Sequence, residues 1–84
     1  MITKKDIVVG FIFQLSYNNT KYEVVEIIDN SRITIDYYNV RLKNITINSN
    51  SFIFAVSTIV EGIKDGSYII IHQPNAKLTY KETL

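Results

Sequence analysis

Residues 51–66 read SFIFAVSTIVEGIKDG, the one stretch of the chain whose apolar residues fall at helical spacing. They recur every three or four positions, at Phe52, Val56, Ile59, Val60 and Ile63. This period predicts a helix over about Ser51–Lys64, and Gly66 suits the left-handed position that follows a helix. The run Phe52–Val56 also fits the end of a strand, so the start of the helix stays open by about one turn.

Four strands are expected before this helix, because β-branched and aromatic residues alternate there with polar ones. They are Val8–Tyr17, Lys21–Ile28, Arg32–Tyr38 and a fourth from Val40 to Ile47, with its register interrupted near Lys43 and Asn44. Short polar turns separate them, which favours antiparallel hairpins. Near Glu26 the alternation slips, as it does at a β-bulge.

A last strand is expected after the helix. Ser67–Gln73 is an unbroken apolar run, typical of a strand covered on both faces, and Pro74 ends it. Residues 1–6 are interpreted as an N-terminal arm and residues 75–84 as a tail, an edge strand at best. We therefore expect a single domain over residues 1–84, mainly β (α+β), with the order β-β-β-β-α-β. It would be a small bent antiparallel sheet or an SH3-like barrel.

The spacing of packing and turn residues resembles that of small SH3-like β-barrel proteins of bacteriophages and gut bacteria. The matching positions are Asp6-x-x-x-Gly10-x-x-Phe13, Tyr22-x-Val24-x-x-Ile27, Ile33-x-Ile35 and Ile63-x-x-Gly66. The resemblance spans residues 6–72 and implies a compact barrel used as a binding module, often one that touches host machinery. It implies no functional residue, because every matching position serves packing or a turn.

Composition narrows the classes of function. Nine Lys and Arg against eight Asp and Glu leave a net charge of +1, which indicates neither a nucleic-acid partner nor an anionic membrane. The absence of cysteine removes disulfides, thiolate metal sites and thiol nucleophiles, and the single histidine, His72, has no neighbouring ligands for zinc. We expect no enzyme, no catalytic residue, no metal and no cofactor.

The expected location is the cytoplasm, or the host cytoplasm if a phage encodes the chain. The apolar run Ile7–Phe13 meets no small-residue cleavage site of the kind that ends a signal peptide. The longest uncharged stretch, Ile45–Val60, is rich in Asn, Ser and Thr and shorter than the ~20 apolar residues that span a bilayer. A membrane partner is therefore not expected.

The leading hypothesis for function is a non-enzymatic binding module for protein–protein association. The partner would be a second copy in a homo-oligomer or a host protein, as for a phage accessory or host-inhibiting protein. Three apolar residues would flank the sheet-facing stripe of the expected helix and form an exposed patch: Ile53, Phe54 and Val60. In the alternative interpretation, Phe54 packs under the C-terminal tail and no such patch exists.

The second hypothesis is a binder of single-stranded nucleic acid or of nucleotides. Barrels of that kind stack bases on aromatic side chains and hold phosphates with cations. The candidate residues lie on or beside neighbouring expected strands: Tyr17, Lys21, Arg32, Tyr38, Arg41 and Lys43. Glu23, Asp29 and Asp36 lie among them and dilute the positive field.

Overall fold

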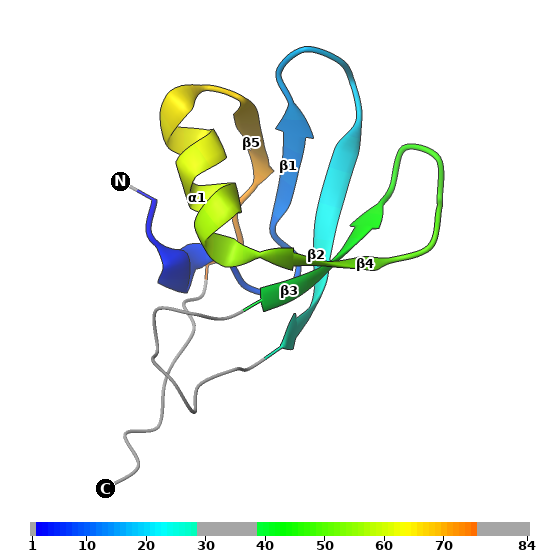
Figure 1. The fold of residues 1–84 in the computed structure, drawn as a ribbon, viewed down its shortest axis with the longest axis horizontal. Helices are drawn as coiled ribbons and strands as arrows, with labels where there is room; N and C mark the ends of the chain where they lie inside the picture. The colour runs from blue at the N-terminus through cyan, green and yellow to red at the C-terminus, as the bar shows by residue number, and fades with distance from the viewer. Residues whose placement is uncertain (1, 29–38, 76–84) are drawn as a thin grey trace, which may run out of the picture.

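The computed structural model describes residues 2–28 and 39–75. Within them lie a short 3-10 helix, five strands and one α-helix (Figure 1). In chain order these are η1 (Lys4–Asp6), β1 (Ile12–Leu15), β2 (Lys21–Ile28), β3 (Asn39–Asn44), β4 (Phe52–Ala55), α1 (Val56–Asp65) and β5 (Tyr68–His72).

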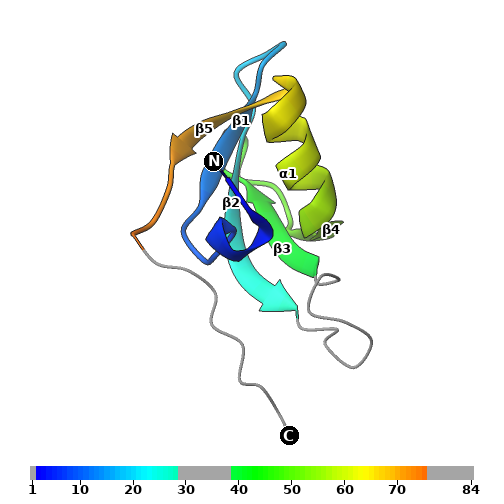
Figure 2. The same cartoon turned by 90° about the vertical axis from the view of Figure 1, so that its left-hand side faces the viewer.

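The strands form one antiparallel sheet in the order β4-β3-β2-β1-β5. Successive hairpins place β1 to β4 side by side, and α1 then crosses from β4 at one edge to β5 at the other. Figure 2 shows α1 on one side of the sheet, which we call the inner face; the opposite side is the outer face. The α+β class and a mainly antiparallel sheet with one helix are confirmed, while the described strands leave the sheet open.

The core lies between the inner face and α1. Its fully buried apolar side chains come from every layer: Ile7, Phe11, Phe13, Val24, Val40, Leu42, Val56 and Ile59, with Val60 almost as buried. Burial of each such side chain contributes about 1.5–3 kcal/mol to stability. The expected arm also belongs to this layer, because Asp6 is buried and its Oδ2 accepts a hydrogen bond from Thr3 N at 2.9 Å.

Strand β2 has the bounds predicted from the sequence, and the predicted bulge is present. The register with β3 shifts between Val24 and Glu26. An extra residue at this point lets Val24 and Ile27 both pack on the inner face and increases the local twist of the sheet. Strand β1 is shorter than expected, since Gly10 takes a left-handed φ of 97° just before it.

The predicted helix start at Ser51 is wrong. Residues Phe52–Ala55 are strand β4, paired with β3, and α1 begins at Val56. The apolar run fits either element locally, and pairing with the β3 backbone selects the strand. The open alternative of a strand end is therefore the correct one. The most regular predicted strand, Arg32–Tyr38, lies outside the described residues.

The predicted fourth strand ends earlier than expected. β3 stops at Asn44, and Ile45 and Ile47 lie exposed in the turn beyond it. The buried Asn44 side chain explains this end, because its Oδ1 accepts hydrogen bonds from Thr46 N at 3.0 Å and Ile47 N at 3.3 Å. A side-chain amide oxygen that accepts hydrogen bonds from the N–H groups two and three residues later holds the chain in a turn, so the hydrogen-bond ladder of the strand ends there.

The predicted left-handed residue at the helix end is confirmed: Gly66 has φ 86°. No atom lies within 4 Å of a Cβ added there, so Gly66→Ala should lose unfolding free energy only through the strain of an alanine in the left-handed region, about 1 kcal/mol. At Gly62 an added Cβ overlaps the Tyr68 ring, so Gly62→Ala should lose more than Gly66→Ala. Urea denaturation of both variants checks this order, and a Gly66→Ala variant as stable as the wild type would contradict the cap.

Candidate functional site

The outer face is built by the residues that alternate with the core residues. Cross-strand partners share a face of the sheet, so the register identifies them. Arg41 lies opposite Ile53 and Glu26, Glu23 lies opposite Lys43 and Ile12, and Gln14 lies opposite Lys21 and Ile69. The face is therefore charged over β2 and β3 and uncharged over β1 and β5.

Two cations of the charged half, Arg41 and Lys43, face acidic partners. Arg41 Nε donates a hydrogen bond to Glu26 Oε1 at 2.8 Å, and Lys43 lies opposite Glu23. Both side chains of the Arg41–Glu26 pair are substantially exposed, so the pair contributes at most about 1 kcal/mol to stability. Its main effect is to neutralise the positive field at this face.

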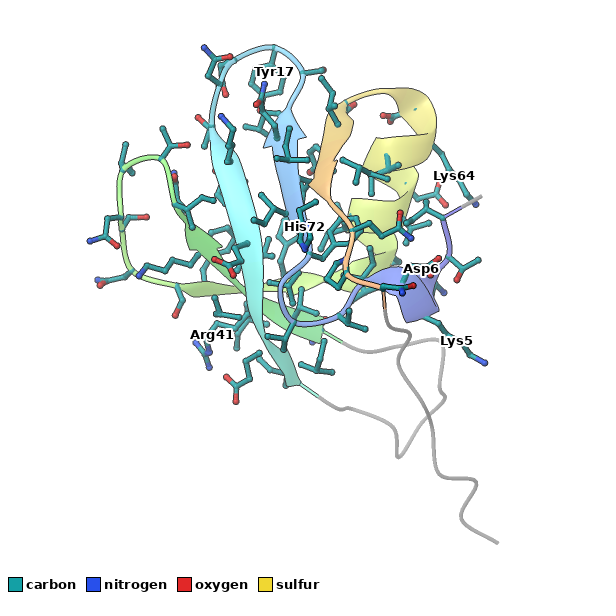
Figure 3. The ribbon with its side chains drawn as sticks, turned by 180° about the vertical axis from the view of Figure 1, so that it is seen from behind. Lys5, Asp6, Tyr17, Arg41, Lys64 and His72 are labelled. Atoms are coloured by element: carbon teal, nitrogen blue, oxygen red, sulfur yellow. The ribbon has the colours of Figure 1, made fainter. Side chains whose placement is uncertain are left out.

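The residues of the nucleic-acid hypothesis do not gather into one site. Lys21, Arg41 and Lys43 share the outer face, but Tyr17 lies in the β1–β2 turn with 75% of its surface exposed. Figure 3 shows Tyr17 and Arg41 at opposite ends of the molecule. Arg32 and Tyr38 lie outside the described residues. The stacking platform and the phosphate-binding cations that such a binder combines are thus separated in the described structure.

The residues of the predicted helix-flank interface do not form one exposed patch either. Val60 is 5% exposed and belongs to the core, Phe54 is half-buried on the inner face, and Ile53 is 55% exposed on the outer face of β4. The reason is the corrected helix start: in a strand, successive side chains point to opposite faces. The predicted surplus of apolar surface is present only at Ile53.

A row of aromatic rings crosses the inner face beyond the helix. Phe13 contacts Tyr68 with ring centroids 4.8 Å apart and Tyr22 at 5.7 Å, and Tyr22 meets Phe52 edge-on at 5.7 Å. Burial of Tyr68 raises the pKa of its phenol above 10.0, helped by nearby Tyr17 and Asp65. The row continues the core towards β4 and ties β5 to the rest of the sheet.

Strand β5, at one edge of the sheet, carries two exposed isoleucines. Ile69 is 47% and Ile71 46% exposed. The prediction that β5 is covered on both faces is therefore wrong. Figure 2 shows β5 at the margin of the ribbon, and among the described residues only β1 pairs with it. Pro74, just after the strand, was the sequence signal for an edge position.

The backbone of β5 presents groups along this edge that have no partner among residues 2–28 and 39–75. Ser16 N donates to Ser67 O at 2.8 Å, and Leu15 N donates to Thr20 O on the β2 side. Because hydrogen-bonded pairs alternate along an antiparallel ladder, Gln14 and Ile69 form the next such pair. The N–H and C=O groups of Tyr68 and Ile70 therefore point away from β1, towards the open edge.

Comparison of the chain with protein-family models, with curated proteins and with solved structures gave no match in any of the three. Within residues 2–28 and 39–75, no three His, Cys, Asp or Glu side chains are grouped so as to hold a metal ion. Over the same ranges, α1 and η1 are too short and insufficiently apolar to cross a membrane. The function of the chain is therefore argued from its own geometry.

The raised pKa of Tyr68 predicts a loss of stability in alkali. The folded state holds the phenol neutral, so this contribution is complete below the unfolded value of 10.0 and is lost as pH rises through the higher folded pKa. The unfolding free energy of the wild type should therefore begin to fall as the pH approaches 10.0 and keep falling until the pH passes the folded pKa of Tyr68. Urea denaturation of Tyr68→Phe should show a shallower fall, and an equal fall in both proteins would contradict the assignment.

Proposed function

We propose that this chain is a non-enzymatic binding module that joins proteins by strand addition at the open edge of β5. The observation that carries the proposal is the combination of outward-pointing backbone groups at Tyr68 and Ile70 with the exposed side chains of Ile69 and Ile71. An added strand would form hydrogen bonds with the backbone groups and apolar contacts with the isoleucine side chains.

The chemistry of the edge specifies the kind of strand that fits. Neither β5 nor β1 contains Asp, Glu, Lys or Arg, and the nearest outer-face neighbours of Ile69 are Gln14 and Ile12. A charged side chain placed there would lose water without finding a partner. The favoured occupant is an extended, uncharged segment with β-branched residues, and its affinity depends little on salt.

Protein association is favoured over nucleic-acid binding by the distribution of charge. The cations at Arg41 and Lys43 each face a carboxylate, and Tyr17, the tyrosine of the hypothesis that the structure describes, lies away from Arg41. Nucleic-acid affinity depends on cations that are free to replace counterions on phosphates. The uncharged edge of β5 offers none.

The likeness to SH3-like barrel proteins of phages belongs to the same proposal. Its support is the order of four hairpin-linked strands, a helix and a last strand that returns beside β1. A partner in a host cell fits this picture as well as a second copy does.

Strand addition is tested by titrating the ¹⁵N-labelled chain with a short peptide in which Thr and Val alternate, at a dilution where light scattering shows a monomer. We expect the amide signals of Tyr68 and Ile70 to shift, with little change on adding salt, because backbone groups make the contact. The same peptide with alternate amides N-methylated should bind much more weakly.

Two variants sharpen this test. Ile69→Lys should weaken peptide binding, whereas Ile53→Lys, an equally exposed site on β4, should leave it unchanged. Shifts confined to β4 would contradict the assignment of the edge. Binding of a single-stranded oligonucleotide with a steep salt dependence, and none of the peptide, would favour the second hypothesis instead.

A further inference from the structure

We infer that the strand which occupies the β5 edge is β5 of a second copy, paired antiparallel about a two-fold axis at Ile69. This inference rests on the proposed strand addition and names its partner. It follows from the positions of the unpaired backbone groups, from the side chains that flank them and from the absence of charge.

The outward groups fix the register. With the axis at Ile69, Tyr68 lies opposite Ile70 of the partner subunit, and Ile70 lies opposite Tyr68 of the partner subunit. Each of these two pairs exchanges both N–H and C=O groups, so all the outward groups at Tyr68 and Ile70 find partners. An axis at Ile70 would extend the ladder to His72, where the register with β1 shifts and Ile71 is the extra residue of a bulge.

The side chains agree with this register. Ile69 lies opposite Ile69 of the partner subunit in a non-hydrogen-bonded pair, where the Cα atoms approach to about 4.5 Å and side chains lie closest. Both isoleucines lie on the outer face, each now 47% exposed, and each shields the other from water. Apolar side chains directly opposite each other on one face stabilise the pairing of two strands.

Charge favours a second copy at this edge. A two-fold axis brings identical residues together, so any charge near it meets its own sign. β5 and β1 carry no charged residue, and the first charges on the outer face, Lys21 and Glu23, lie on β2. At the other edge, Ile53 of β4 lies directly beside Arg41, so an axis there would bring two guanidinium groups towards each other.

The closed geometry also distinguishes this pairing from a head-to-tail one. If β5 of one copy added to β4 of the next, each copy would leave an open edge and the sheet would grow without end. Pairing of β5 with β5 joins two five-stranded sheets and covers both β5 edges at once.

The register is tested by single cysteines, because the chain has none of its own. A non-hydrogen-bonded pair has a Cα separation of about 4.5 Å, inside the range of about 4.4–6.8 Å that a disulfide needs. We expect full-length Ile69→Cys to form a linked dimer at least about tenfold faster under mild oxidation than Ile71→Cys or Ile53→Cys. The three sites are similarly exposed, so reactivity alone does not produce this order.

Light scattering gives the second readout. The wild type should be a dimer at high concentration, and Ile69→Lys should shift it to monomer while circular dichroism stays unchanged. Equal linking rates at all three cysteines, or a wild type that remains monomeric at high concentration, would overturn the inference. So would amides of Tyr68 and Ile70 that resist hydrogen exchange in a dilute monomer, since another segment of the same chain would then cover them.

The outcomes separate this inference from the proposed function. A monomer whose edge still binds the Thr and Val peptide keeps strand addition and removes the second copy as its occupant. A monomer whose edge binds no peptide removes both.

Discussion

The structure depends on one connection, in which a ten-residue helix carries the chain from one edge of the sheet to the other. At 1.5 Å per residue α1 is about 15 Å long, while five strands at about 4.8 Å spacing set their edges about 19 Å apart. The helix is too short to lie straight across a flat sheet of that width; it runs alongside β5 and β1, and the twist of the sheet brings the end of β4 to its first residue (Figure 1). The face that α1 covers becomes the core, and the outer face carries the charged residues of β2 and β3.

The position of α1 against β5 depends on a close contact between Gly62 and Tyr68. Only glycine leaves room for the Tyr68 ring against α1, and that ring in turn packs on Phe13 of β1. The helix, β5 and β1 are thereby fixed as one unit. β5 is held with its inner side chains in the core and its backbone groups at Tyr68 and Ile70 directed outward.

The sequence was sufficient to predict the elements that are determined by residues close to one another in the chain. Apolar and polar alternation predicts the bounds of β2 and its bulge, and backbone sterics predict the left-handed Gly66. Both depend only on residues that are neighbours in the sequence. The sequence was insufficient where a distant partner selects between two local solutions. Residues 52–55 form a strand because they pair with β3. β3 ends at Asn44 because the buried side-chain amide of that residue hydrogen-bonds to the backbone of the following turn.

The candidate site shows the same limit in a sharper form. Whether Ile69 and Ile71 are buried depends on whether another strand lies beyond β5, which no pattern within residues 67–73 expresses. The helix-flank patch was wrong for a related reason, because Phe54 lies in β4 before the helix and Val60 lies on the side of α1 that packs on the core. Exposure is a property of the assembled sheet.

The open edge is also limited in a way that bears on its use. Long, flat apolar edges promote unregulated aggregation, and natural sheets limit them with bulges and prolines. Here the bulge at Ile71 and the ring of Pro74, which lies against Gly10, bound the accessible ladder to residues 68–70. An edge this short restricts the proposed strand addition to one register and disfavours a growing stack. The features that make β5 available to a partner are thus accompanied by features that restrict how that partner binds.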